Sequence, residues 1–195
     1  MGALELGLLA AMCWGFHDVC VRFISQKTPI SACIFIVLIV GLIFHICLMM
    51  PSKEISTITK AAFTYASIAG VSFVIASFSL YYAFKRGPVK LVAPLIASYP
   101  ILSITWAIWI GTPVSKLQIL AVLAIILGVS IVAIMSDNSE EEIPPIGKTI
   151  ALSIVAAIAF ACTFALGQAA AELSPHMSAT LVTRIISILI CAVII

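Results

Sequence analysis

Apolar runs of about twenty residues follow one another along most of this chain, and they constrain its fold more than any other feature. An α-helix rises about 1.5 Å per residue, so a run of this length crosses the roughly 30 Å hydrocarbon core of a bilayer. The pattern predicts an all-α membrane protein, a polytopic bundle of transmembrane helices. We count seven segments, separated by short stretches with turn-forming residues, at about 4–24, 30–50, 61–84, 91–110, 117–135, 147–171 and 178–195.

The charge content excludes a soluble globular domain. Charged residues make up 9% of the chain and hydrophobic residues 63%, whereas soluble domains carry about 25% charged residues. The cations are scattered singly or in pairs and form no basic stripe, which argues against a nucleic-acid partner. The expected partners are the lipid bilayer and a small-molecule substrate, and the chain could form a homodimer.

Neither the cysteines nor the short motifs indicate a catalytic centre. All six cysteines lie inside apolar runs and none forms a C-x-x-C pair, so we interpret them as small apolar helix residues. We therefore predict no metal site and no cofactor. The sequence contains no G-x-S-x-G, no H-E-x-x-H and no Walker loop. We expect that the protein is not an enzyme.

An acidic, proline-ended segment divides five apolar runs from two. When the second part is shifted back by 146 positions, Ala10 and Ala11 meet Ala156 and Ala157, and prolines 29 and 175 coincide. An odd number of helices would place a second copy upside down, and such inverted repeats recur in secondary transporters. The predicted division is a first repeat at 1–135, an acidic linker at 136–146, and the start of a second repeat at 147–195.

Small residues recur every four positions on two of the segments. They are Gly7, Ala11 and Gly15 in the first, and the alanines at 157, 161, 165 and 169 in the sixth. In lipid this spacing lets helix backbones approach closely. Both stripes are predicted to be helix-packing faces.

Three stretches resemble the EamA-type transporters of the drug/metabolite transporter superfamily. Residues 8–15 are like that family's small-rich opening helix ending in Trp-Gly. Residues 81–100 are like its passage from the third to the fourth helix, with a late proline, and residues 118–129 are like its fifth helix. The resemblance implies ten helices in two inverted five-helix repeats, and transport of small metabolites, such as amino acids or similar compounds, by alternating access.

The same comparison exposes departures from the family pattern. Thr112 stands where members often have a glutamate, and Leu38 where they often have an arginine, so no role of those residues is carried over. By the ten-helix plan the second repeat is incomplete after Ile195. We expect that the chain is a partial transporter.

Charged side chains inside transmembrane helices are candidate functional groups, because each costs roughly 2.5–3.5 kcal/mol at the helix centre. Asp18 either belongs to a site or pairs with Arg22 one turn later. Arg184, about two turns into the last segment, either contacts an anion, or extends toward the interface or forms a structural pair. His17 can either change charge near neutral pH or hydrogen-bond a neighbouring helix.

Segment 91–110 is the most informative stretch for a binding site. Pro94 and Pro100 interrupt it, and each frees a backbone carbonyl one turn earlier, which in lipid needs a partner or a watery cavity. We hypothesise that Asp18, Ser98 and Tyr99 face a common cavity. The candidate substrate-binding residues are Trp14, His17, Asp18, Ser98, Tyr99, Gln168 and Arg184.

The resulting interpretation is a multi-pass transporter of the cell membrane. The alternative is a non-transporting membrane scaffold or assembly subunit, which needs packing stripes but no wet cavity. Proton coupling through Asp18 or His17 and uniport are both open. The positive-inside rule, with three cations on the N-terminal side against six on the other, places the N-terminus outside. The resemblance implies a cytoplasmic N-terminus, which we adopt.

Overall fold

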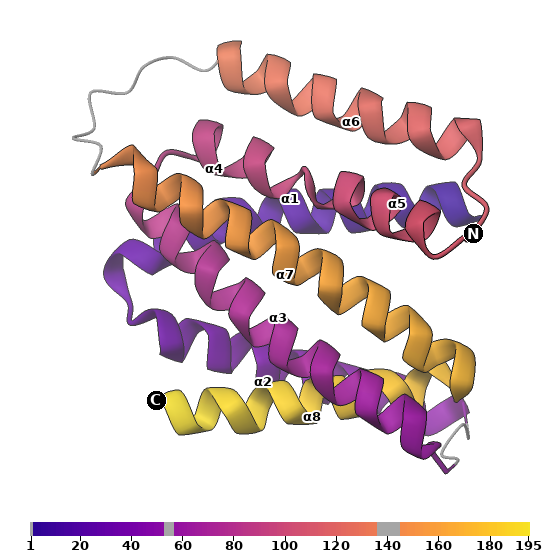
Figure 1. Ribbon diagram of the computed structural model, residues 1–195. Coiled ribbons are helices and arrows are strands. Elements are labelled where there is room, and N and C mark those ends of the chain that lie inside the picture. The colour runs from indigo at the N-terminus through magenta and orange to yellow at the C-terminus, as the bar shows by residue number, and fades with distance from the viewer. Residues whose placement is uncertain (1, 53–56, 136–144) are drawn as a thin grey trace.

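The computed structural model describes residues 2–52, 57–135 and 145–195, and every regular element in these ranges is a helix. The all-α prediction is therefore confirmed. In chain order the helices are α1 (Ala3–Lys27), α2 (Ile30–Ser52), α3 (Lys60–Arg86), α4 (Val89–Ile96), α5 (Tyr99–Trp109), α6 (Lys116–Met135), α7 (Ile146–Leu173) and α8 (His176–Ile194) (Figure 1).

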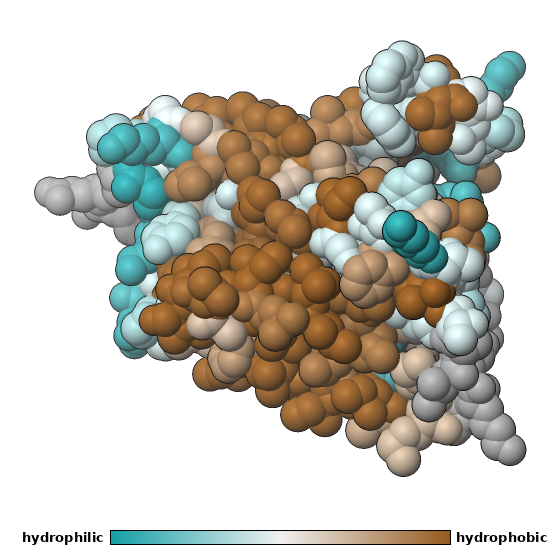
Figure 2. Space-filling view, turned by 60° about the horizontal axis from the view of Figure 1, so that its bottom comes forward, coloured by the Kyte–Doolittle hydropathy of each residue, from teal (hydrophilic) through white to brown (hydrophobic). Residues whose placement is uncertain are grey.

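Within the described residues, six stretches are long and apolar enough to cross a membrane, with α4 and α5 together forming one of them. The part of α6 whose side chains are described, Lys116–Ile131, is apolar but shorter. Figure 2 shows a broad hydrophobic face, with hydrophilic side chains toward the left and right edges. Large apolar side chains such as Met12, Phe16 and Trp109 are more than 70% exposed. This is a surface suited to lipid.

The centre of the bundle is the pair α3 and α7, which run side by side through the middle of Figure 1. α3 also packs against α1, α2 and α8, whereas α6 packs against α4 and α5 at one edge. Small side chains allow this closeness, because two helices in lipid gain most from direct backbone approach. The fully or almost fully buried alanines are 62, 66, 69, 76 and 83 on α3, and 156, 157 and 170 on α7.

The segment expected as one helix at 91–110 is two, with a break at residues 97 and 98. Pro94 lies inside α4 and Pro100 in the first turn of α5, and neither has an amide hydrogen to donate. At the break, the Ser98 amide and hydroxyl both donate to the Leu95 carbonyl, at 3.3 Å and 2.6 Å. The two prolines thus break the helix, and Ser98 at the break supplies hydrogen bonds to the Leu95 carbonyl.

Apart from α4 and α5, which continue one another, successive helices alternate in direction, so most connections gather at two ends of the bundle. At one end the Thr59 amide, just before α3, donates to the Ser174 hydroxyl, just after α7, at 3.0 Å. At the other end Gly87, which follows α3, lies against Thr149 in the first turn of α7. Residues 136–144 of the expected linker lie outside the described residues, and the inverted repeat stays a prediction.

Candidate functional site

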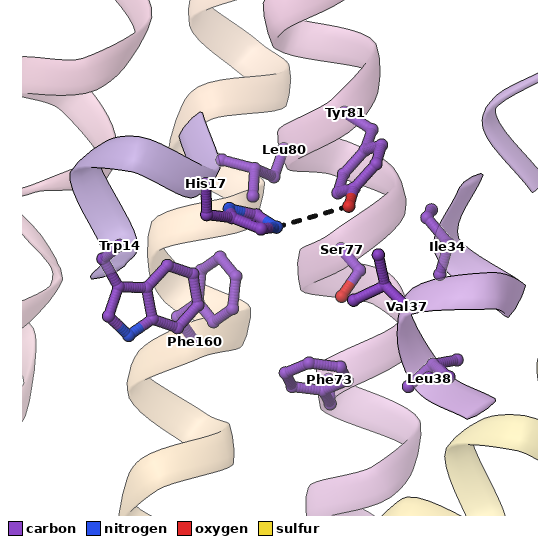
Figure 3. A pocket seen from close by; sticks show the side chains of 10 residues that line it. All are labelled: Trp14, His17, Ile34, Val37, Leu38, Phe73, Ser77, Leu80, Tyr81 and Phe160. Atoms are coloured by element: carbon purple, nitrogen blue, oxygen red, sulfur yellow. Dashed lines mark hydrogen bonds between the residues drawn. The ribbon is translucent and has the colours of Figure 1, made fainter. Parts of the chain in front are cut away.

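A small cavity lies inside the bundle, between α1, α2, α3 and α7 (Figure 3). Its volume is about 30 Å³, which is room for one or two water molecules. A metabolite could therefore enter only if the surrounding helices moved apart. The lining residues are Trp14, His17, Ile34, Val37, Leu38, Phe73, Ser77, Leu80, Tyr81 and Phe160.

Helical periodicity explains which side chains reach this cavity. Trp14 and His17 are three positions apart on α1, and Phe73, Ser77 and Leu80 recur at four and three positions on α3. Residues at these spacings share one face of a helix. α7 contributes Phe160, which is 3% exposed. Helices from both parts of the chain thus form the cavity wall.

A line of hydrogen-bonding groups crosses from α1 to α3 beside the cavity. His17 Nδ1 lies 3.1 Å from Asp18 Oδ1, and His17 Nε2 lies 3.3 Å from the Tyr81 hydroxyl oxygen. An ionised carboxylate only accepts, so with neutral His17 the Nδ1–H donates to Asp18 and Nε2 accepts from Tyr81. Asp18 therefore fixes the tautomer of His17 and, through it, the direction of the Tyr81 hydroxyl.

Aromatic rings surround this polar line and make the cavity wall mostly apolar. The Trp14 ring meets those of His17 and Phe160 edge-on, with centroids 5.4 Å and 5.8 Å apart, and Phe73 meets Phe160 at 6.2 Å. Such geometry is favourable for aromatic pairs. The arrangement suits a small molecule with an apolar body and one or two polar groups.

Several of the predicted site residues lie elsewhere. Ser98 lines a separate hollow of about 200 Å³ between α5 and α7. The Tyr99 ring packs on Phe160 and Phe164, with centroids 6.5 Å and 5.3 Å apart, and does not itself line the cavity. The Gln168 amide is exposed and donates to Glu172 on the same helix at 3.1 Å.

Of the seven predicted residues, the structure brings Trp14, His17 and Asp18 together. The Tyr99 ring contacts Phe160, which in turn contacts Trp14. Arg184 is half-buried on α8, where its guanidinium lies against Gly41 of α2. The remaining two, Ser98 and Gln168, lie apart from this group.

The sequence analysis did not single out Tyr81, although it is 4% exposed and bonded to His17. The signal available was its position four residues after Ser77, on a face of α3 that also carries Phe73. Within the described residues no three His, Cys, Asp or Glu side chains gather closely enough to hold a metal ion. The described contacts between the site residues are hydrogen bonds and aromatic contacts.

Comparison with known proteins places these features in a family. Residues 1–134 match the sequence pattern of the EamA-like transporter family. An uncharacterized protein of Methanocaldococcus jannaschii is 30% identical over 133 residues, an alignment that covers 68% of this chain and 96% of that protein. No solved structure matches the chain.

Proposed function

Because this chain belongs to the EamA-like transporter family, we propose that it moves a small metabolite, such as an amino acid or a similar compound, across the cell membrane by alternating access. The observation that carries the proposal is the cavity at Trp14, His17 and Tyr81. There, aromatic rings and hydrogen-bonding groups meet between four helices of a membrane bundle. A scaffold would need the packing alanines but no hydrogen-bonding groups beside an interior cavity.

The cavity is placed where a movement between helices would change it. Among the described residues that line it, Phe160 alone comes from the second part of the chain, and the others belong to α1, α2 and α3. Phe160 contacts both Trp14 and Phe73. A shift of α7 against α1 and α3 would part these rings and enlarge the cavity, as alternating access requires.

His17 is the group through which a proton could be coupled to transport. When neutral it accepts from Tyr81, but a doubly protonated imidazole has two donors and no acceptor. Protonation would therefore turn the Tyr81 hydroxyl from donor to acceptor, and so change the polar lining of the cavity. A uniporter would carry its substrate without this step, so a response to an imposed pH gradient separates the two mechanisms.

The proposal is tested by uptake into liposomes that contain the purified protein. We expect a panel of labelled amino acids and related metabolites to include at least one that enters faster than into empty liposomes. Tyr81→Phe and His17→Gln should each reduce that uptake by about tenfold, the effect of losing one hydrogen bond worth roughly 1.4 kcal/mol.

The control is Tyr82→Phe, which removes the same hydroxyl from the next residue of α3. Tyr82 is 44% exposed and does not line the cavity, so uptake should match the parent. If folded, monodisperse protein transports no member of the panel, the scaffold alternative is favoured. If uptake occurs but Tyr81→Phe and Tyr82→Phe behave alike, the transport path lies elsewhere.

A further inference from the structure

Arg184 lies near the middle of the length of α8 and is half-buried, a position where a charge needs an explanation. It lies eight residues after His176, the first residue of α8, or about 12 Å along the helix. α8 runs antiparallel to α2: Cys191 lies near the Ser31 carbonyl, and His45 Nε2 lies 2.9 Å from the Met177 carbonyl oxygen. Arg184 faces α2 between these two contacts, at Gly41.

The absence of a side chain at Gly41 makes room for the guanidinium. A Cβ built at residue 41 would overlap Nη1 of Arg184. The same helix face carries Ile34, Leu38 and His45, at spacings of four, three and four residues around Gly41, and all three are buried. The arginine head is thus held within the bundle against α2.

This position adjoins the cavity of the proposed transport site. Ile34 and Leu38 line the cavity, and Gly41 is one turn beyond Leu38, a rise of about 4.5 Å. In Figure 3 the yellow ribbon of α8 passes just below Leu38. On the other flank, the Ser187 hydroxyl of α8 donates to the Gly70 carbonyl at 3.0 Å, one turn from Phe73 of the cavity wall. α8 therefore packs against α2 and α3 within one turn of the cavity wall, although none of its own residues lines the cavity.

The carboxylates in the described part of the chain are engaged elsewhere. Glu5 accepts from the Gly2 amide, Asp18 contacts His17, and Glu172 accepts from Gln168. The Nε atom of Arg184 is buried and has no hydrogen-bond partner. A guanidinium at mid-membrane costs several kcal/mol unless an anion or acceptor offsets it.

We propose that Arg184 anchors a carboxylate group of the transported solute, an inference that rests on the proposed function. A guanidinium binds a carboxylate through two parallel N–H···O bonds. One guanidinium balances the single charge of a carboxylate, whereas a phosphate dianion would need a second cation, and the described residues lining the cavity include no lysine or arginine. The solute's apolar part would then lie toward Phe160 and Trp14.

The test uses acids and their amides as matched probes on the purified full chain. The pairs are L-alanine with L-alaninamide, L-leucine with L-leucinamide, and L-phenylalanine with L-phenylalaninamide. We expect at least one acid to bind the parent protein, measured by calorimetry, at least about tenfold more tightly than its amide. Arg184→Gln should abolish that preference, and Arg184→Lys should retain part of it.

Gly41→Ala tests the position of the guanidinium without removing its charge, since the added methyl group would displace the Arg184 head group. It should weaken acid binding, whereas Gly128→Ala on α6, where a Cβ meets nothing within 4 Å, should not. Equal binding of acid and amide, acid binding that survives Arg184→Gln, or no binding of any acid overturns the inference. Transport that persists without an acid preference overturns the inference and leaves the proposed function standing. Acid binding without any transport contradicts the proposed function and leaves Arg184 only as a carboxylate-binding residue.

Discussion

At the scale of single residues, Arg22 shows how a cation can serve the fold instead of the site. Its Nη1 donates to the carbonyls of Phe84 and Lys85 in the last turn of α3, at 2.5 Å and 3.5 Å. Carbonyls at a helix C-terminus lack partners within the helix and carry partial negative charge. Arg22 therefore joins α1 to the end of the central helix.

We expect Arg22→Gln to lower the free energy of unfolding by about 1.5–3 kcal/mol, the range for hydrogen bonds made by charged groups. The measurement is reversible unfolding of the purified protein in mixed micelles. Lys27→Gln removes an exposed cation five residues later on α1 and should change stability little. Equal losses from the two variants would show that the contact with α3 contributes nothing.

The site residues differ in how visible they are from the sequence. Trp14, His17 and Asp18 stand out because polar and amphipathic groups are rare inside an apolar run. Tyr81 and Tyr82 are adjacent and chemically alike, and only the packing of α3 decides that the first is buried and the second exposed. Ser98 was singled out by the neighbouring prolines, but its hydroxyl donates to a carbonyl at the break between α4 and α5, which no spacing rule reveals.

At the scale of helices, Gly70 controls how closely α3 and α8 approach. A Cβ at residue 70 would lie 2.8 Å from the Thr183 carbonyl oxygen and 3.0 Å from Ile186 Cβ. The hydroxyls of Thr183 and Ser187 donate to the Ala66 and Gly70 carbonyls across this contact, at 3.1 Å and 3.0 Å. Both hydrogen bonds depend on the short distance between the two backbones.

Gly70→Ala should therefore destabilise the protein by about 1–3 kcal/mol through overpacking. Thermal unfolding in detergent measures the change. Gly167→Ala on α7, where an added Cβ meets nothing within 4 Å, is the matched control and should be neutral or slightly stabilising. A Gly70→Ala protein as stable as the control would mean that α3 and α8 can separate without loss.

The small-residue stripes illustrate what a helix pattern can and cannot predict. On α7, Ala157 and Ala161 are buried, at 3% and 8% exposure. On α1, Gly7, Ala11 and Gly15 are exposed, and a Cβ at either glycine would meet nothing within 4 Å. A stripe shows that a face permits close approach, but it does not identify the partner. In the described structure, the partner of the alanine face of α7 is the alanine face of α3.

At the scale of the whole molecule, the membrane class follows from the length of the apolar runs. Of the seven predicted segments, six are long enough to span a membrane among the described residues, and the described part of α6 is shorter. The arrangement of the helices does not follow from these runs, because helices that are apolar on every side carry little information about which side faces inward. Burial among the described residues depends instead on small side chains and on single polar contacts between helices. The five-helix repeat and the division at the acidic linker are still predictions.

Orientation is another property of the whole molecule on which two arguments differ. The end of the bundle opposite the N-terminus, which holds Arg22, Lys85 and Lys148, carries more cations than the N-terminal end. The positive-inside rule would place that opposite end in the cytoplasm. Arg22, however, is bonded to the end of α3, so it does not act as a free loop cation. Without Arg22 the count is still five cations against three, so the cytoplasmic N-terminus implied by the family resemblance stays a prediction.

The most direct test of the central claim is whether the cavity is reached from both sides of the membrane. Ser77 lines the cavity and is 6% exposed, and Ser79 is also buried on α3 but does not line it. In a cysteine-free background, Ser77→Cys should react with a membrane-impermeant thiol reagent added to either side, and a transported substrate should slow the reaction. Ser79→Cys should stay unreactive. Reaction of Ser77→Cys from neither side, or from one side only under every condition, would contradict alternating access through this cavity.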